Sequence, residues 1–422
     1  MSFQQALSGL NAASKNLEVI GNNVANANTF GNKSSRAEFA DMYAAAMNGA
    51  GANAVGIGVN LAAVAQQFTQ GNISTTDNPM DLALNGPGFF QVSDGQGAPM
   101  YTRNGQFHID RDGRIVNNQR LQLMGYPADA SGTIQPGTAT ALQLPTAGIT
   151  PAVTTRVTLE VNLDSRVATT APAAAPAIDF GNPATYNNAT SLLAYDDKGQ
   201  EIALSYYFQK AGNDQWNVFA TVNGAPAYGT AAAPQPLPGM PLQFSANGAG
   251  ITSPAQPMSF DIPASTNSAG ALTLPVAGVL LDMSGATQYG AGFGVTNLAQ
   301  DGFAPGQLAG VVIDSSGVLM ARYTNGQTKP AGQLALASFR NPQGLQPMGG
   351  NAWVRTRESG DPVVGVAGQG NLGVLQAGAL EESNVDLTAE LVNMITAQRV
   401  YQANAQTVKT LDTVMQTLVN LR

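Results

Sequence analysis

Both ends of the chain carry the hydrophobic spacing of an α-helix. Near the N-terminus the apolar positions recur in steps of three, four or seven, at Phe3, Leu7, Leu10, Leu17 and Val24. Near the C-terminus a second run follows Ser383 and Asp386, which resemble a capping box, and its apolar positions are Leu387, Leu391, Met394, Tyr401, Val408, Leu411, Met415 and Leu418. This spacing predicts amphipathic helices over about 3–24 and 387–421, close to the coiled-coil period.

Neither predicted helix can bury its apolar stripe by itself. The stripes can pack on each other, on the rest of the chain, or on other copies of the chain, and the spacing alone leaves these outcomes open. The opposite faces of both segments are rich in Asn, Gln and Ser and carry few charges.

The first helical segment ends in a cluster of asparagines, "NNVANANTFG" at 22–31. Asparagine tolerates turn conformations and bonds the nearby backbone, so 22–28 can end or bend the helix while its polar groups stay paired. Gly31 can supply the sharpest turn. A plain helix end followed by a loop is the alternative interpretation of the same residues.

Between the helices the pattern becomes that of β-strands. The stretches 85–92, 99–110 and 113–126, and later 310–327 and 332–339, alternate apolar and polar residues around turn sequences, which predicts hairpins. Further strands are expected at Val157–Leu163, Ile202–Phe208 and Trp216–Val222, in a segment interrupted by Pro- and Ala-rich loops. The chain therefore reads as helix, β block, inserted β block, β block and helix.

This order predicts a multidomain α+β fold in which paired terminal helices form a coiled-coil-like layer and nested, mainly β domains lie between them. We expect four parts: a helical domain of 1–32 with 380–422, linkers at 33–70 and 363–379, a first β domain of 71–145 with 284–362, and an inserted outer β domain of 146–283.

Composition narrows the function classes. Charged residues make up 11% of the 422 residues against about 25% in typical proteins, and the net charge of −8 argues against a nucleic-acid partner. The chain has no cysteine, which excludes disulfides and thiolate chemistry. It shows no membrane-spanning run and no cleavable secretory signal, so we expect no membrane insertion and either a cytosolic location or export without cleavage.

No arrangement of residues predicts catalysis. His108 is the single histidine and lies in a strand pattern. The fragment Asp110-x-Asp112-Gly113 resembles part of a calcium loop, but His108 and Gln119 stand where that loop needs acidic ligands. A glycosidase would need two facing carboxylates, which spacing cannot show, and only Trp216 and Trp353 could serve as sugar platforms. We therefore expect no enzyme activity, no cofactor and no metal site.

Several segments resemble a known family. The stretch "SGLNAASKNLEVIGNNVANANTFGNKSSRAEF" is similar to the N-terminal signature of the flagellar rod, hook and hook-associated axial proteins, and "LEESNVDLTAELVNMITAQRVYQANAQTVKTLDTVMQTLVNLR" is similar to their C-terminus. "NPMDLALNGPGFFQV" and the following 101–127 resemble their shared first β domain. The signature turn maps onto Asn22, Asn23, Asn26, Asn28, Thr29 and Gly31, with Asn32 where the family usually has phenylalanine.

The resemblance implies a function. The inserted block of about 138 residues, 146–283, and "ADMYAA" at 40–45 resemble the hook version of the family, which implies a structural subunit of the bacterial flagellar hook. Such a subunit self-assembles into a hollow, bendable helical tube that joins rod to filament and transmits torque. A distal rod protein of the same family is the alternative, and a secreted β-rich adhesin or hydrolase is the alternative from another class.

The resemblance also implies partners and a location. The partners would be further copies of the chain, the distal rod protein, the hook cap protein and the hook–filament junction protein. The location would be the extracellular flagellum, reached through the flagellar type III apparatus without a cleaved signal peptide. The helical stripes would then be the self-assembly surface.

Overall fold

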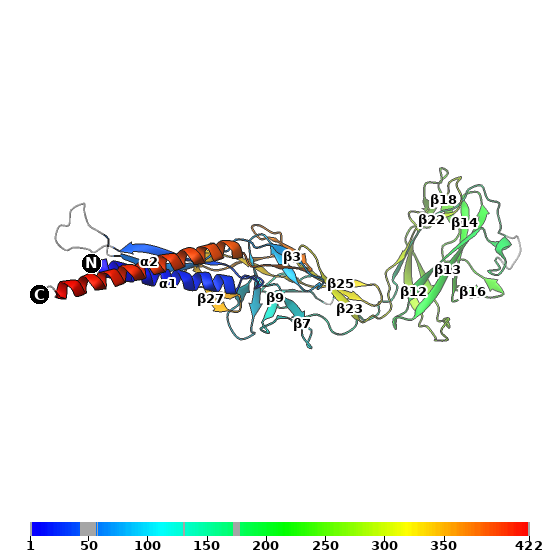
Figure 1. Ribbon diagram of the computed structural model, residues 1–422. Coiled ribbons are helices and arrows are strands. Elements are labelled where there is room, and N and C mark those ends of the chain that lie inside the picture. The colour runs from blue at the N-terminus through cyan, green and yellow to red at the C-terminus, as the bar shows by residue number, and fades with distance from the viewer. Residues whose placement is uncertain (1, 43–55, 57, 130, 172–177, 421–422) are drawn as a thin grey trace. The chain divides into compact units, whose positions relative to one another are not determined.

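The structure is a computed structural model that describes residues 2–42, 56, 58–129, 131–171 and 178–420 (Figure 1). It divides into two compact units. The first comprises Met1–Thr146, Gly310–Arg322 and Thr328–Arg422, and the second comprises Ala147–Ala309 and Tyr323–Gln327. The terminal helices and the many-stranded β regions between them confirm the predicted multidomain α+β class.

Helix α1 (Ser2–Ala25) and helix α2 (Leu387–Asn420) lie side by side in the first unit, with both chain ends at the same end of the pair (Figure 1). Asp386 caps α2, because its Oδ1 accepts from the backbone N–H groups of Thr388 and Ala389. The predicted capping box is therefore a single Asp cap. Ser383 does not take part in that cap and instead accepts from Val385 N–H.

Among the described residues, the β part of the first unit consists of one large sheet and three two-stranded sheets. The large sheet follows the order β23-β24-β25-β9-β5-β6-β28-β27, with β7, β8, β10, β26 and β29 attached, and the small sheets are β1-β2, β3-β31 and β30-β4. The bounds are β1 (Ser35–Met42), β2 (Gly58–Gln66), β3 (Ile73–Thr75), β4 (Leu82–Asn85), β5 (Phe89–Ser93), β6 (Met100–Thr102), β7 (Phe107–Ile109), β8 (Ile115–Asn117), β9 (Gln122–Pro127), β10 (Thr140–Ala141), β23 (Leu308–Ile313), β24 (Val318–Tyr323), β25 (Thr328–Leu334), β26 (Leu336–Ser338), η2 (Pro342–Gly344), β27 (Gln346–Gly349), β28 (Ala352–Val354), β29 (Val363–Gly365), β30 (Val374–Ala377) and β31 (Ala379–Glu381).

The second unit is a β structure of its own. Its sheets have the orders β20-β21-β11-β22, β12-β13-β14-β18-β19 with β15 attached to β14, and β16-β17. The bounds are β11 (Arg156–Asn162), η1 (Pro183–Thr185), β12 (Asn188–Tyr195), β13 (Glu201–Gly212), β14 (Gln215–Val222), β15 (Ala225–Pro226), β16 (Gly229–Thr230), β17 (Ala233–Pro234), β18 (Leu242–Phe244), β19 (Ile251–Ser253), β20 (Met258–Ile262), β21 (Val276–Asp282) and β22 (Gly294–Gln300).

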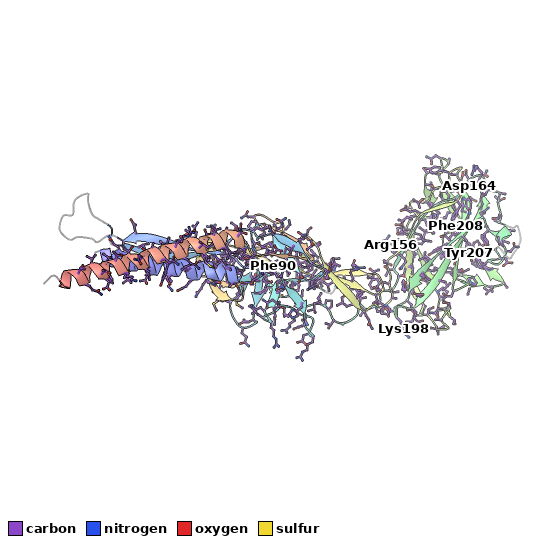
Figure 2. The ribbon with its side chains drawn as sticks, in the orientation of Figure 1. Phe90, Arg156, Asp164, Lys198, Tyr207 and Phe208 are labelled. Carbon is purple, nitrogen blue, oxygen red and sulfur yellow. The ribbon has the colours of Figure 1, made fainter. Side chains whose placement is uncertain are left out.

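Each unit has a separate hydrophobic core. Phe90, Leu123 and Leu334 belong to the core of the first unit, and Trp216, Tyr206 and Phe208 belong to that of the second. Tyr207 and Phe208, labelled in Figure 2, are neighbours on β13 and are expected to face opposite sides of the sheet. Phe208 enters the core, while Tyr207 packs against the rings of Phe180 and Tyr186 at 4.8 and 5.0 Å.

Two predicted boundaries differ from the observed division. The inserted domain was expected to end at 283, but β22 (Gly294–Gln300) pairs with β11, so 284–309 belong with the second unit. The predicted linkers 33–70 and 363–379 contain the β1-β2 hairpin, β29 and β30. Most of the Gly/Ala-rich stretch 44–60 lies outside the described residues. The alanines and glycines of this stretch made the strand pattern of the flanking residues hard to recognise in the sequence.

One five-residue turn recurs six times in the described chain. Its first residue is Asp or Asn, at 110, 117, 129, 196, 267 and 314, and the side-chain oxygen accepts from the N–H groups two and four residues later. The fourth residue is left-handed and is glycine in five turns, whereas Arg120 takes that place in the sixth with φ 63. The calcium-like fragment at Asp110 is thus a turn held by N–H groups.

The turn at 117–121 yields a stability prediction. Arg120→Gly removes the cost of a left-handed arginine and should raise the free energy of unfolding of the first unit by about 1 kcal/mol. The matched reverse change is Gly270→Ala in the second unit, where a new Cβ meets nothing within 4 Å, so conformation alone should lower stability by about 1 kcal/mol.

Urea unfolding followed by tryptophan fluorescence separates the two units. Trp353 reports on the first unit in a Trp216→Phe background, and Trp216 reports on the second in a Trp353→Phe background. A loss of stability in Arg120→Gly would contradict the assignment of strain to that residue.

Candidate assembly surface

The asparagine cluster lies at the end of α1, where its residues form hydrogen bonds with one another. The backbone N–H of Asn26 donates to the carbonyls of Asn22 and Asn23, and its side-chain amide donates to Asn22 O at 2.9 Å. Thr29 N–H donates to Asn26 O, and the half-buried Thr29 hydroxyl lies 3.5 Å from Asn26 Oδ1. Gly31 has φ +71 and would place a Cβ 2.4 Å from Asn104 N, so only glycine fits there. Asn28 is exposed, and no hydrogen bond of its side chain is evident.

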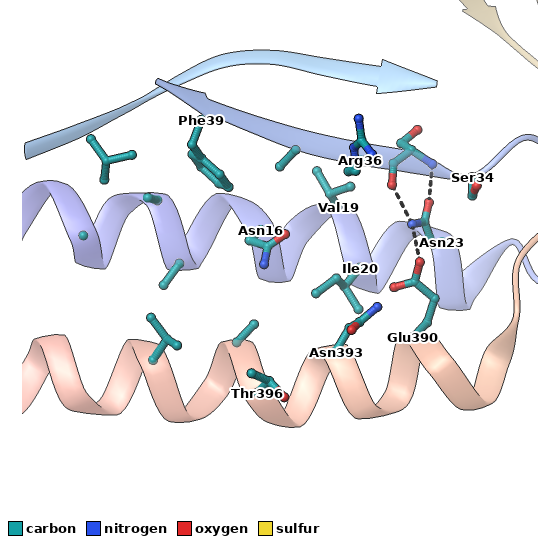
Figure 3. Close-up of a pocket in the computed structure, with 18 of the residues that line it drawn as sticks. Asn16, Val19, Ile20, Asn23, Ser34, Arg36, Phe39, Glu390, Asn393 and Thr396 are labelled. Atoms are coloured by element: carbon teal, nitrogen blue, oxygen red, sulfur yellow. Dashed lines mark hydrogen bonds between the residues drawn. The ribbon is translucent and has the colours of Figure 1, made fainter. Parts of the chain in front are cut away.

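Two other asparagines tie the turn to distant segments. Asn23 is buried, and its amide forms a two-way pair with the backbone of Ser35 while donating to Glu390 Oε1 of α2 at 3.0 Å (Figure 3). Asn384 accepts from Ser34 N–H at 2.7 Å and donates to Gln67 O at 2.7 Å. These bonds fix α1, β1 and α2 in one arrangement. Asn32, the departure from the family pattern, lies 3.5 Å from Ser383 Oγ.

A buried ion cluster stands directly behind the turn. Glu381 of β31 binds Lys33 at 2.6 Å and Arg103 at 3.1 Å, and the side chains of Glu381 and Lys33 are fully buried. Backbone carbonyls of Thr69, Leu84 and Gly86 accept from the two cations. Burial, together with the second positive charge of Arg103, lowers the pKa of Lys33, although Glu381 opposes the shift. Sequence reasoning missed this cluster, because its members are 70 or more residues apart.

The two helices pack antiparallel through small side chains. A Cβ on Gly9 would lie 3.0 Å from Asn404, and Asn23 bonds Glu390, so fourteen residues separate the two contacts on each helix. With heptad letters a to g assigned from these contacts, the a and d positions of α1 are Ala6, Gly9, Ala13, Asn16, Ile20 and Asn23. Four of them, Ala6, Ala13, Ile20 and Asn23, are buried, as is Ala397 opposite them on α2.

The large apolar side chains occupy a different heptad position. Every e position of both helices is large and apolar: Phe3, Leu10, Leu17 and Val24 on α1, and Leu387, Met394, Tyr401, Val408 and Met415 on α2. In an antiparallel pair the e positions of the two helices fall on the same side. Together with the flanking Leu7 and Leu391, these residues form what we call the apolar strip.

The chain does not bury the apolar strip. Leu10, Leu17, Val24, Met394 and Val408 are half-buried, whereas Phe3, Leu7, Leu387, Leu391, Tyr401 and Met415 are exposed, Met415 by 62%. Of the remaining predicted stripe residues, Leu411 is a half-buried a position, and the side chain of Leu418 lies outside those described. Eleven of the thirteen predicted stripe residues therefore lie on one side of the pair, beside the interface between the helices.

A groove lies on the other side of the helix pair. It has a volume of about 660 Å³ between α1, α2 and the β1-β2 hairpin. Val19 points to the hairpin and Ile20 to α2, while Phe39 of β1 and Asn393 and Thr396 of α2 form its walls (Figure 3). The lining side chains of both helices come from a, d and g positions, so the groove and the apolar strip occupy opposite faces.

The described residues give little support for a catalytic site, a metal site or a membrane-spanning helix. His108 is exposed on β7, and no group of three or more His, Cys, Asp or Glu side chains that could hold a metal is found among the described residues. None of the helices described here is long and apolar enough to cross a bilayer.

Four family models match successive stretches of the chain. They are "Flagella basal body rod protein" at 3–33, "Flagellar hook protein FlgE/F/G D1 domain" at 83–162, "Flagellar basal body protein FlaE D2 domain" at 162–303 and "Flagellar basal body rod FlgEFG protein C-terminal" at 376–421. The D2 match extends past 283, in agreement with the pairing of β22 in the second unit.

Relatives match over the full length. The flagellar hook protein FlgE of Escherichia coli K12 is 39% identical over 428 residues, covering all of both chains, and that of Rhizobium meliloti is 33% identical, covering all of this chain and 98% of its own. The crystal structure of Helicobacter pylori flagellar hook protein FlgE2 has a TM-score of 0.51 at 14% identity, covering 73% of this chain and all of that one, which shows a shared fold.

The buried cluster predicts a large effect of one charge. Glu381→Gln leaves Lys33 and Arg103 buried without a carboxylate and should lower the free energy of unfolding of the first unit by about 3–5 kcal/mol. Glu382→Gln, at the next, half-buried position, should change it by less than about 0.5 kcal/mol. Urea unfolding read from Trp353 measures both, and equal effects of the two changes would contradict the role of Glu381.

Lys33 also predicts a pH dependence. The pKa of Lys33 is lower in the folded chain than the ordinary value of 10.5, which we take for the unfolded chain. At a pH between the folded and the unfolded pKa, the unfolded chain binds more protons than the folded chain. Its contribution to the free energy of unfolding therefore rises with pH across that window. The difference in stability between the parent chain and Lys33→Met should shift in favour of the parent as pH approaches 10.5; a constant difference would contradict the lowered pKa.

Proposed function

The chain belongs to the family of flagellar hook proteins FlgE, and from that membership we propose how its terminal helices build the hook. It is a structural subunit of the bacterial flagellar hook. In our proposal the helix pairs of many copies form the wall of a hollow helical tube that joins rod to filament, bends and transmits torque.

The observation that carries this proposal is the apolar strip. A chain that uses Ala, Gly and Asn between its helices leaves eleven larger apolar side chains half-buried or exposed along about 40 Å of helix. Fully burying one such side chain is worth about 1.5–3 kcal/mol relative to exposing it. Covering the strip with a neighbouring copy therefore supplies a strong drive for polymerisation.

If the chain were instead a secreted β-rich adhesin or hydrolase, the apolar faces of its helices would be buried against the rest of the same chain. The exposure of Phe3, Leu387 and Met415 favours the polymer instead. The family is one of structural proteins, and we propose that the chain has no catalytic activity. A distal rod role is disfavoured by full-length similarity to hook proteins, including the second unit.

Partners and location follow the same proposal. The chain assembles with itself and with axial proteins of its family in the flagellum. We propose the distal rod protein, the hook cap protein and the hook–filament junction protein as those partners, and export through the flagellar type III apparatus without a cleaved signal peptide. The face of α2 that is turned away from α1 is rich in uncharged Gln and Thr residues such as Gln402, Gln406 and Thr413, and it also carries the exposed Arg399 and Lys409.

Charge placed in the apolar strip tests the proposal. Val408→Asp or Leu391→Asp should abolish tube formation, because the interface would bury an unpaired carboxylate, while both β units stay folded. Gln406→Asp on the outer face of the same helix is the matched control and should form tubes. Electron microscopy of concentrated protein gives the result, and urea unfolding read from both tryptophans checks the fold. Normal tubes from Val408→Asp and Leu391→Asp would refute the role of the strip.

A further inference from the structure

The groove is lined by small side chains where the apolar strip has large ones. The g positions that face the groove include Ala12 and Val19 on α1 and Thr396 on α2, opposite the Leu, Met and Tyr residues of the e positions. The helix pair therefore carries large side chains on one face and a groove on the opposite face.

The groove also holds apolar side chains that the chain leaves uncovered. Val400 is 47% exposed and Phe39 is 38% exposed, and both line the groove. Among the lining residues that the structure describes, the charged ones are Arg36 and Glu390; both lie at one end, where Asn23 donates a hydrogen bond to Glu390. The rest of the lining is uncharged and mixes apolar side chains with the amides of Asn16, Asn393 and Asn404, so it suits an uncharged occupant such as the side chains of the apolar strip.

The symmetry of a polymer favours the same occupant. If the strip of one copy paired with the strip of another, the contact would be isologous and would close as a dimer, with both grooves empty. A contact between two different faces leaves a free strip at one side and a free groove at the other, so further copies can add. Because the two faces are opposite each other on the pair, such additions extend the wall instead of capping it.

We propose that the apolar strip of one copy docks into the groove of a neighbouring copy. The proposal rests on the proposed function and names the partner surface that covers the strip. Large e-position side chains of one copy fill the space above Ala12 and Ala397 of the next and cover Phe39 and Val400.

Single cysteines test this contact, because the parent chain has none. One chain carries Ala12→Cys in the groove, and the other carries a strip cysteine, at Leu10, Leu17 or Met394 in turn. Tubes grown from a mixture of the two are oxidised and run on a non-reducing gel. At least one strip position should give dimers of unlike chains, since a disulfide needs Cα atoms within about 7 Å.

Controls and rival outcomes separate the interpretations. Gln406→Cys on the outer face, mixed with Ala12→Cys, should give no unlike dimers. Tubes that form and yield only strip–strip dimers, or no dimers from any strip position, would overturn the docking while leaving the proposed function intact. Failure of the cysteine-free parent to form tubes at any concentration would instead count against the proposed function.

A filled groove gives a second measurement. Ala12→Trp or Thr396→Trp occupies the space that the strip needs and should raise the protein concentration required for tubes by about tenfold or more, with both units still folded. An unchanged concentration for both variants would overturn the proposal.

Discussion

The antiparallel pairing of α1 and α2 decides which side chains the chain can bury by itself. Gly9 meets Asn404 and Asn23 meets Glu390, so the register is held at two places two heptads apart. Small residues at the a and d positions let the helices approach closely, but the contact between the helices buries little apolar surface. The larger residues are displaced to the e positions, where the described part of a single chain covers them only in part. In the proposed assembly, a neighbouring copy covers the apolar surface that this modest intrachain contact leaves exposed.

The polar turn after α1 makes that register specific. Asn23 and Asn384 satisfy backbone groups of Ser34, Ser35 and Gln67, and a shift of either helix by one residue would leave buried amides unpaired. Hydrophobic contacts alone would tolerate such a shift more easily. The asparagine cluster therefore does more than end a helix, because it connects the helical layer to the β body in one geometry.

Much of the fold was predictable from the sequence because local signals were strong. The periodicity placed both helices within a residue or two of their ends, and β11, β13 and β14 lie where alternation indicated strands. The alignment of Leu10, Leu17 and Val24 was visible too. What the sequence could not show was which of two adjacent heptad faces met the partner helix, since Ala6 and Ala13 are weak hydrophobic signals beside leucine. Long-range pairings such as Lys33 with Glu381, and β22 with β11, leave no local trace at all.

The position of Glu381 has a mechanical consequence. Lys33 lies after the end of α1, and Glu381 lies before the start of α2. The Glu381 carboxylate therefore joins the two segments that connect the helices to the rest of the first unit. Arg103, which follows β6, links this carboxylate to the large sheet. A twist applied to the helices is therefore transmitted to the β part of the first unit through this buried ion cluster, which lies next to Gly31, a position that admits no side chain. Such a joint is stiff at its centre, and compliance must reside in the segments beyond it.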